Sequence, residues 1–452
     1  MTEVVIMKHA SCTLCPGAEL YVIPKDTFKT DFIMISFVLP LKVQTAAEYA
    51  LLPSVLCRGS ERYPTLEDLA RRLDTLYNAG IACRAHKRGE AQVVTFQLRC
   101  LEQDVVPPED DNEGPLFVSL LDTFCDLLFS PLLRDGAFYD AYVDGEKKNL
   151  CEAIRSKINN KAAYAVSRLD EAMFADECYG ISARGTEESV AAVTPKSMYR
   201  CYLDMLAHAP VTVTYVGRMT QDTVSVALAR FVRLLATHRQ QGESLYAPQT
   251  KVIRAAEHPL RRVEESMDIR QSRLCIGYRT GRVLSDGDFY RFALFNELLG
   301  GSASSKLFLE VRENRGLCYD CASYPEAQKG ILYISCGIAA DAKDEAEEAI
   351  AQQIAAIRDG DITDEEFHAA KKSLVSGYRE IEDSAAAIAV WYENRRAAGI
   401  ETSPEETAAQ VMTCTREDLA RCAEGLTQDT LYFLQGTCTD GDDEEDYDDD
   451  TD

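Results

Sequence analysis

The chain has 452 residues, of which 48 are basic and 74 acidic, so its formal net charge is −26, and 46% of its residues are apolar. This length and apolar content suit roughly two to four domains with buried cores, and they exclude collagen, wholesale disorder and a disulfide miniprotein. Nucleic acid is not expected as the main ligand, because phosphate binding relies on a basic face.

The N-terminal residues show no long apolar core behind a basic flank, and the sequence contains no apolar run of about eighteen residues. We therefore predict neither a signal peptide nor a membrane span. The 16 cysteines are scattered among apolar positions, as small buried side chains would be. A reduced, cytoplasmic protein is the simpler expectation.

The predicted elements follow one order twice along the chain. The first half has a strand at 32–39, a helix at 66–76, a strand at 93–98, a long helix at 116–133 and a closing strand at 211–216. The second half has a strand at 274–278, helices at 306–312 and 346–357, a strand at 332–338 and a closing strand at 430–434. Strands grouped around helices predict an α+β fold in which each half is an antiparallel-rich sheet covered by helices.

Landmarks of the first half recur in the second half at a nearly constant offset, which indicates a duplication. The matched positions are Leu52 and Leu294, Leu56 and Leu298, Gly59-Ser60 and Gly301-Ser302, Tyr77 and Tyr319, Gly89 and Gly330, and Lys147 and Lys371. We predict an N-terminal half at 1–237, a linker at 238–262, a C-terminal half at 263–438 and a disordered acidic tail at 439–452.

Several kinds of catalytic motif are missing. A hydrolytic zinc site usually needs two histidines one helical turn apart, and no two of the six histidines lie within five residues of each other. The P-loop spacing and the Gly-x-Ser-x-Gly nucleophile elbow are also absent.

Two Cys-x-x-Cys pairs occur, Cys12 with Cys15 and Cys318 with Cys321. Together they could form a four-thiolate zinc site, and separately each could be a redox pair. The pairs lie far apart in the sequence, so unligated cysteines are the favoured interpretation.

Residues 50–60 read Ala-Leu-Leu-Pro-Ser-Val-Leu-Cys-Arg-Gly-Ser, and residues 311–319 read Val-Arg-Glu-Asn-Arg-Gly-Leu-Cys-Tyr. With these segments the chain resembles the pitrilysin/insulinase metallopeptidases, whose subunits consist of two similar α+β halves. The first segment stands where active members carry the inverted zinc motif His-x-x-Glu-His. The two histidine positions are Ala50 and Ser54, and the catalytic glutamate position is Pro53. The resemblance thus implies no catalytic residue and no bound metal in this chain, with zinc on a partner subunit.

Glu152 lies about where the family supplies its third zinc ligand, but alone it cannot hold the ion. An exposed helical glutamate is the alternative that we favour for this residue.

Other parts of the family pattern are retained. Residues 179–195 resemble its Tyr-Gly and Gly-Thr-Glu-Glu segments, and residues 299–319 closely resemble its C-terminal signature. By this resemblance, Arg312 and Tyr319 would bind substrate, with Gly300, Gly301 and Ser302 as a supporting loop. A guanidinium fork and a phenol hydroxyl suit a peptide carbonyl. Alternatively, Arg312 pairs with a neighbouring acid and Tyr319 packs under the glycine turn.

The resemblance predicts a non-catalytic bacterial subunit that forms a cytoplasmic heterodimer with a zinc-bearing homologue and helps to bind a peptide or small protein substrate. Residues 51–53 and 58–60 most resemble the branch of inactive subunits associated with 5-aminopentanol modification of elongation factor P. A scaffold protein of the same fold, a homodimer and a cysteine-based metal or redox protein remain open alternatives. No nucleic acid or membrane partner is expected.

Overall fold

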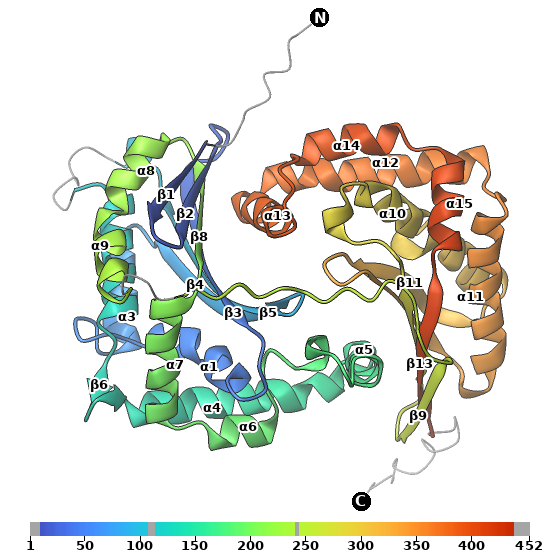
Figure 1. Cartoon of the computed structure of the whole chain (residues 1–452), viewed down its shortest axis with the longest axis horizontal. Helices are drawn as coiled ribbons and strands as arrows, with labels where there is room; N and C mark the ends of the chain where they lie inside the picture. The colour runs from blue at the N-terminus through green and yellow to red at the C-terminus, as the bar shows by residue number, and fades with distance from the viewer. Residues whose placement is uncertain (1–9, 107–113, 240–243, 438–452) are drawn as a thin grey trace, which may run out of the picture. The chain divides into compact units, whose positions relative to one another are not determined.

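The computed structural model describes residues 10–106, 114–239 and 244–437 (Figure 1). The predicted acidic tail at 439–452 lies outside these ranges. The chain forms two compact units, each of which combines one main sheet with covering helices. The predicted α+β class is confirmed. In the described ranges, no helix is long and apolar enough to cross a membrane.

Unit 1 contains the described residues up to Arg155, together with Ile181–Thr250 and Ile381–Ala397. Its main sheet has the order β1-β2-β8-β3-β5-β4, and only the pair of β2 and β8 is parallel. The strands of this sheet are β1 (Ala10–Cys15), β2 (Ala18–Pro24), β3 (Thr30–Pro40), β4 (Gly80–Arg88), β5 (Ala91–Leu101) and β8 (Val211–Gly217). A separate small hairpin joins β6 (Leu133–Arg134) to β7 (Ala137–Phe138).

The longer helices of unit 1 pack mainly on one face of its sheet. They are α1 (Ala46–Leu56), α2 (Leu66–Thr75), α3 (Leu116–Phe129), α4 (Asp140–Arg155), α6 (Glu187–Ala192), α7 (Pro195–His208), α8 (Gln221–Ala227) and α9 (Ala229–Thr237). The short η1 (Gln103–Val105) precedes α3, and η9 (Ile381–Asp383) precedes α13 (Ala385–Ala397). The core beneath these helices is apolar and fully buried, with Phe37, Phe96 and Phe124 at its centre.

Unit 2 contains Ser156–Gly180, Lys251–Glu380 and the described residues from Ala398 onward. Its sheet has the order β11-β12-β10-β13-β9, with β9 (Arg261–Met267), β10 (Ser272–Arg279), β11 (Cys318–Glu326), β12 (Ile331–Ile338) and β13 (Thr427–Gly436). Its helices are α5 (Lys161–Met173), α10 (Phe289–Asn296), α11 (Lys343–Arg358), α12 (Asp364–Glu380), α14 (Pro404–Met412) and α15 (Arg416–Glu424). Its shorter helical segments are η3 (Ser156–Asn159), η4 (Cys178–Gly180), η5 (Leu284–Asp286), η6 (Glu297–Gly301), η7 (Leu307–Asn314) and η8 (Ala340–Ala342).

The duplication is visible in the strand order. Strands β2-β8-β3-β5-β4 of unit 1 correspond one by one to β9-β13-β10-β12-β11 of unit 2, and in both sheets only the first pair is parallel. The two matched lysines make equivalent hydrogen bonds. Lys147 Nζ donates to the carbonyls of Ala191 and Val193, and Lys371 Nζ donates to those of Met412 and Cys414, each at the end of a helix.

One sequence landmark does not correspond in the structure. Tyr77 lies in the turn before β4 with a φ of 55°, whereas Tyr319 lies within β11.

Each unit takes one helix from the other half of the sequence. Helix α13 covers β3 and β8 of unit 1, where Ile388, Ala389 and Tyr392 pack on Phe32 and Met34. Helix α5 likewise covers β10 and β13 of unit 2. The compact units are therefore not two contiguous halves of the chain.

A buried cluster of charges fixes the segment after α5 in unit 2. Glu177 accepts a hydrogen bond from Arg279 at 2.7 Å and forms an ion pair with Lys329, whose Nζ lies 2.7 Å from Oε2, and Arg279 also donates to Asp429 at 2.8 Å. All four side chains are at most 6% exposed. Each charge has an opposite partner, so burial is tolerated.

Candidate functional site

Helix α1 carries the positions of the missing zinc motif. Ala50 and Ser54 are half-buried one turn apart, while Pro53 is buried within the helix. The helix continues through Pro53, although proline supplies no backbone N–H for the preceding turn. These three side chains offer no imidazole or carboxylate, and among the described residues no group of three or more His, Cys, Asp or Glu side chains is placed to hold a metal.

Glu152 lies on α4 and is exposed to solvent. A different glutamate of the same helix contacts the end of the motif segment. Arg58 Nε donates to Glu146 Oε1 at 2.5 Å, and these side chains are 28% and 14% exposed. Arg58 and Glu146 thus form an ion pair that joins the end of the motif segment to α4. Sequence reasoning missed this pair, because its members are 88 residues apart.

The Gly-Thr-Glu-Glu segment has a structural role in unit 1. Thr186 caps α6 through the N–H of Ser189, and Thr194 caps α7 in the same way through Ser197. Gly185 has a φ of +70°, and an added Cβ would approach the Cβ of Ala47 to 3.1 Å. Glycine is needed there because the loop passes close to the start of α1.

The glycine loop of the second half supports β11. An added Cβ at Gly300 would lie 2.6 Å from Ser323 Oγ and 2.7 Å from the Ser323 backbone nitrogen. Ser323 in turn donates to Asn296 Oδ1 at 2.8 Å. Ser302 contacts only the neighbouring Ser304 hydroxyl, at 3.2 Å, among its described side-chain partners. Gly300 therefore permits the close approach of η6 and β11 that holds the strand in place.

Arg312 projects from η7, a helix with a π-type turn in which Arg315 N–H donates to Glu310 O at 3.2 Å. Its side chain is 42% exposed, and its guanidinium lies 4.6 Å from the centre of the Phe308 ring. Arg312 Nε also lies 3.4 Å from Glu313 Oε1. The alternative that Arg312 pairs with a neighbouring acid is therefore correct. An exposed ion pair of this kind is weak, however, and leaves the guanidinium able to bind another group.

Tyr319 does not pack under the glycine turn, so that alternative is wrong. Its side chain is 79% exposed, and the hydroxyl has no hydrogen-bond partner among the described residues. In the pairing of β11 with β12, Cys318 faces Ile338 and Asp320 faces Gly337, so Tyr319 is the extra residue of a β-bulge. Bulges redirect side chains and are frequent beside binding and catalytic sites.

Arg312 and Tyr319 come from two elements that pack against each other, η7 and β11. The pKa of the Cys318 thiol is raised to about 11, mainly by burial and also by Asp320, against the opposing positive charge of Arg312. Arg312 and Tyr319 are both exposed in unit 2.

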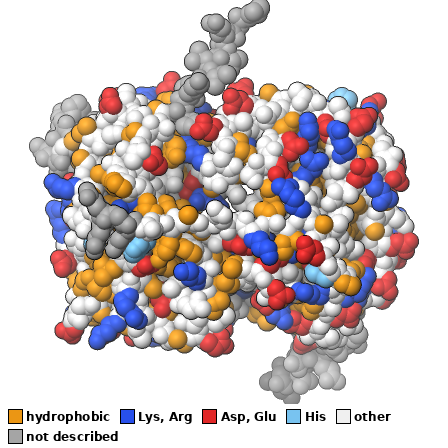
Figure 2. Space-filling view, in the orientation of Figure 1, with side chains coloured by type: hydrophobic (Ala, Val, Ile, Leu, Met, Phe, Trp, Pro, Cys, Tyr) orange, Lys and Arg blue, Asp and Glu red, His pale blue; other side chains and the backbone are white. Residues whose placement is uncertain are grey.

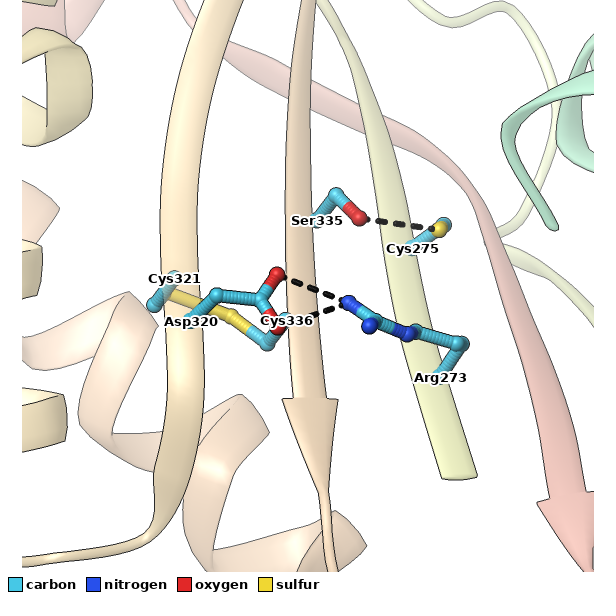
Figure 3. The surroundings of a disulfide bond; sticks show 6 residues. All are labelled: Arg273, Cys275, Asp320, Cys321, Ser335 and Cys336. Carbon is cyan, nitrogen blue, oxygen red and sulfur yellow. Dashed lines mark hydrogen bonds and ion pairs between the residues drawn. A yellow bond between two sulfur atoms is a disulfide. The ribbon is translucent and has the colours of Figure 1, made fainter. Parts of the chain in front are cut away.

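The cysteines of this region are paired differently from either proposed motif. A disulfide joins Cys321 to Cys336, which lie opposite each other on β11 and β12 with a Cα–Cα distance of 4.2 Å (Figure 3). Cys318 keeps a free thiol, and so do Cys12 and Cys15. The expectation of a reduced protein is wrong for Cys321 and Cys336, because strand pairing brings together residues that no local spacing could relate.

Comparisons with known proteins agree with this geometry. Residues 192–374 match the family model described as the peptidase M16 inactive domain. The probable inactive metalloprotease YmfF of Bacillus subtilis (strain 168) is 29% identical over 93% of this chain and 96% of its own length.

Two solved structures are similar over 95% of this chain and 99% of their own. A conserved protein from Enterococcus faecalis V583 has a TM-score of 0.86 and 25% identity. A peptidase M16 inactive domain from Pseudomonas fluorescens has a TM-score of 0.74 and, at 17% identity, shows the fold alone. By these similarities the chain is an M16-like peptidase homologue, and the positions of the zinc motif hold Ala50, Pro53 and Ser54.

Proposed function

We propose that this chain is the non-catalytic subunit of a zinc peptidase pair, in which a zinc-bearing homologue supplies the metal and this chain supplies Arg312 and Tyr319 to bind a peptide. One observation carries the proposal: Tyr319 is the extra residue of a bulge and is 79% exposed. An exposed tyrosine can pack its ring on a ligand and hydrogen-bond through its hydroxyl, which is why tyrosine is enriched at binding interfaces.

The position of β11 supports peptide binding. This strand ends the sheet order of unit 2, so one of its edges has no partner strand within that sheet. Such an edge can pair with an extended peptide through backbone hydrogen bonds. A peptide on this edge would pass Tyr319, whose hydroxyl can donate to a carbonyl, and Arg312 can bind a carbonyl or carboxylate.

The test is peptide cleavage by the reconstituted pair after Arg312→Ala and Tyr319→Phe. We expect the Michaelis constant of the pair to rise about tenfold for Arg312→Ala, which corresponds to about 1.4 kcal/mol. Arg315→Ala is the matched control, because Arg315 lies on the same turn and donates instead to Gln352 of unit 2. Unchanged kinetics in both site variants would favour a scaffold with no part in proteolysis.

The finer assignment follows from the segment resemblance. We propose that the pair acts in bacterial cytoplasm and is linked to 5-aminopentanol modification of elongation factor P. The test is the intact mass of elongation factor P from cells that lack this chain. Loss of the modification is expected, and an unchanged mass would remove this link without touching the peptide-binding proposal.

A further inference from the structure

The outer hairpin of unit 1 differs in charge from the chain as a whole. On the face drawn in Figure 2, acidic and basic side chains are interspersed, and the chain carries −26 overall. Between Gly80 and Leu101, by contrast, the only acidic residue is Glu90, whereas Arg84, Lys87, Arg88 and Arg99 are basic. The β4–β5 hairpin is therefore a locally basic segment.

The register of the hairpin places Arg84, His86, Arg88 and Arg99 on one face and Lys87 on the other. Arg99 lies opposite Gly80 and Phe32, Arg84 lies opposite Thr95, and His86 lies opposite Val93. Phe32 packs toward α13, while Ile81, Cys83 and Ala85 pack into the core on the other side. Arg84, His86 and Arg99 thus share the face of the sheet that α13 covers only in part.

These side chains have few partners within the fold. Arg88 is satisfied by Glu393 of α13 at 2.9 Å. The side chains of Arg84 and Arg99 are exposed and make no hydrogen bond or ion pair with a described residue. His86 is half-buried, and its Nδ1 has no hydrogen-bond partner. The pKa of His86 is lowered to about 4, mainly by burial and in addition by the positive charges of Arg84 and Arg88.

A surface cavity of about 470 Å³ lies at one end of this row, within unit 1. Phe28, Phe32 and Ala82 give it an apolar lining, and Gln97, Arg99 and the acidic Asp383 add polar groups. Gly80 also borders it, and an added Cβ there would meet no atom within 4 Å. The cavity can hold an apolar side chain beside a cation.

We propose that the open face of the β4–β5 hairpin binds an acidic peptide segment, with carboxylates on Arg84 and Arg99 and an apolar side chain in the cavity beside Phe32. The acidic body of the protein does not prevent this binding, because charges separated by more than about 8 Å are largely screened at physiological salt. The unpaired guanidiniums of Arg84 and Arg99 make the hairpin face prefer an anionic ligand, since they bind carboxylates in a bidentate geometry.

This site is distinct from Arg312 and Tyr319, and its test uses the full chain without a partner, so the two proposals can fail separately. The probe is a fluorescent peptide that alternates glutamate with leucine and carries one benzophenone group. Its binding is measured by anisotropy, and its cross-links are mapped by mass spectrometry. An analogue with glutamine in place of glutamate reports the contribution of charge.

We expect the glutamine analogue to bind at least about tenfold more weakly. Arg84→Gln with Arg99→Gln should weaken the acidic peptide to a similar extent, and Gly80→Leu should do so by filling the cavity. Arg233→Gln is the matched control, because Arg233 is exposed on α9 of the same unit and pairs with no described residue. Far-UV circular dichroism verifies that each variant folds.

Cross-links within residues 28–32, 80–99 or 383–386 are the expected result. Equal binding of the two peptides, no effect of the hairpin variants, or cross-links elsewhere would each overturn the proposal. Equal competition by inorganic tripolyphosphate would also overturn it, because a simple anion site needs no peptide.

Discussion

The outer hairpins of the two units occupy the same place in a duplicated sheet but differ in detail. In unit 1, β4 and β5 pair without a bulge from Gly80 to Arg88, and a two-residue turn joins them. In unit 2, β11 has a bulge at Tyr319, a longer turn at 327–330 and a disulfide to β12. The strand order was kept after duplication, while the outer strands acquired different surface chemistry.

The buried charge cluster of unit 2 gives the largest expected effect. Lys329→Met should destabilise the protein by about 3–5 kcal/mol, because it removes one partner of a buried ion pair and leaves Glu177 less compensated. Urea denaturation measures the loss. Arg71→Met is the control, since Arg71 pairs with Glu67 on the exposed surface of α2 and should cost about 1 kcal/mol or less. Equal losses of stability in the two variants would contradict a special role of the buried charge cluster in unit 2.

The disulfide should stabilise the β11–β12 hairpin of unit 2 and not the β4–β5 hairpin of unit 1. Its two cysteines are 15 residues apart, and the chain-entropy model gives about 3 kcal/mol for a loop of that size. Reductant should therefore lower the stability of the native protein and leave the stability of the Cys336→Ala variant unchanged. Alkylation of the denatured protein before and after reduction counts the thiols. An identical count would mean that the pair is not joined.

Two glycine substitutions compare a closely packed site with an open helical site. Gly300→Ala should cost about 1–3 kcal/mol, because its Cβ would collide with Ser323 of β11. Gly377→Ala on α12 should instead stabilise the protein by up to about 1 kcal/mol, since that site is open and helical. Thermal unfolding of both variants gives the comparison. A neutral Gly300→Ala would show that η6 and β11 do not need this approach.

The buried cluster also predicts a pH dependence. Burial raises the pKa of Glu177, but hydrogen bonds from Arg279 and Lys329 outweigh it, so the pKa lies below its ordinary value of 4.5. Glu177 therefore stabilises the folded state above pH 4.5, and this contribution is lost as the pH falls through its lowered pKa. Glu177→Gln should show a shallower loss of stability in acid. Parallel curves for the two proteins would contradict this assignment.

Much of the fold could be predicted from local pattern. The apolar runs that became β3, β5, β8, β10, β12 and β13 mark the central strands, because these strands are buried on both faces. The long helix expected at 116–133 ends earlier, at Phe129, since Ser130 and Pro131 begin a turn. Strand β9 was missed because its Arg and Glu side chains alternate at a sheet edge and carry little apolar signal.

The exchange of α5 and α13 could not be predicted, because amphipathic helices carry no label for the sheet that they will cover. For the site, the sequence motif located Arg312, Tyr319 and Gly300, but the bulge at Tyr319 and the Cys321–Cys336 pair depend on strand register. Register is set by tertiary pairing, which one sequence does not display. The open face of the β4–β5 hairpin was hidden for the same reason.

Native mass spectrometry of the tagged chain, isolated gently from its source cells, tests the central claim most directly. It reads subunit composition and bound metal in one experiment. The proposed function predicts a one-to-one complex with a similarly sized homologue that carries one zinc ion. A metal-free monomer or homodimer would contradict it and leave Arg312 and Tyr319 without a shared site.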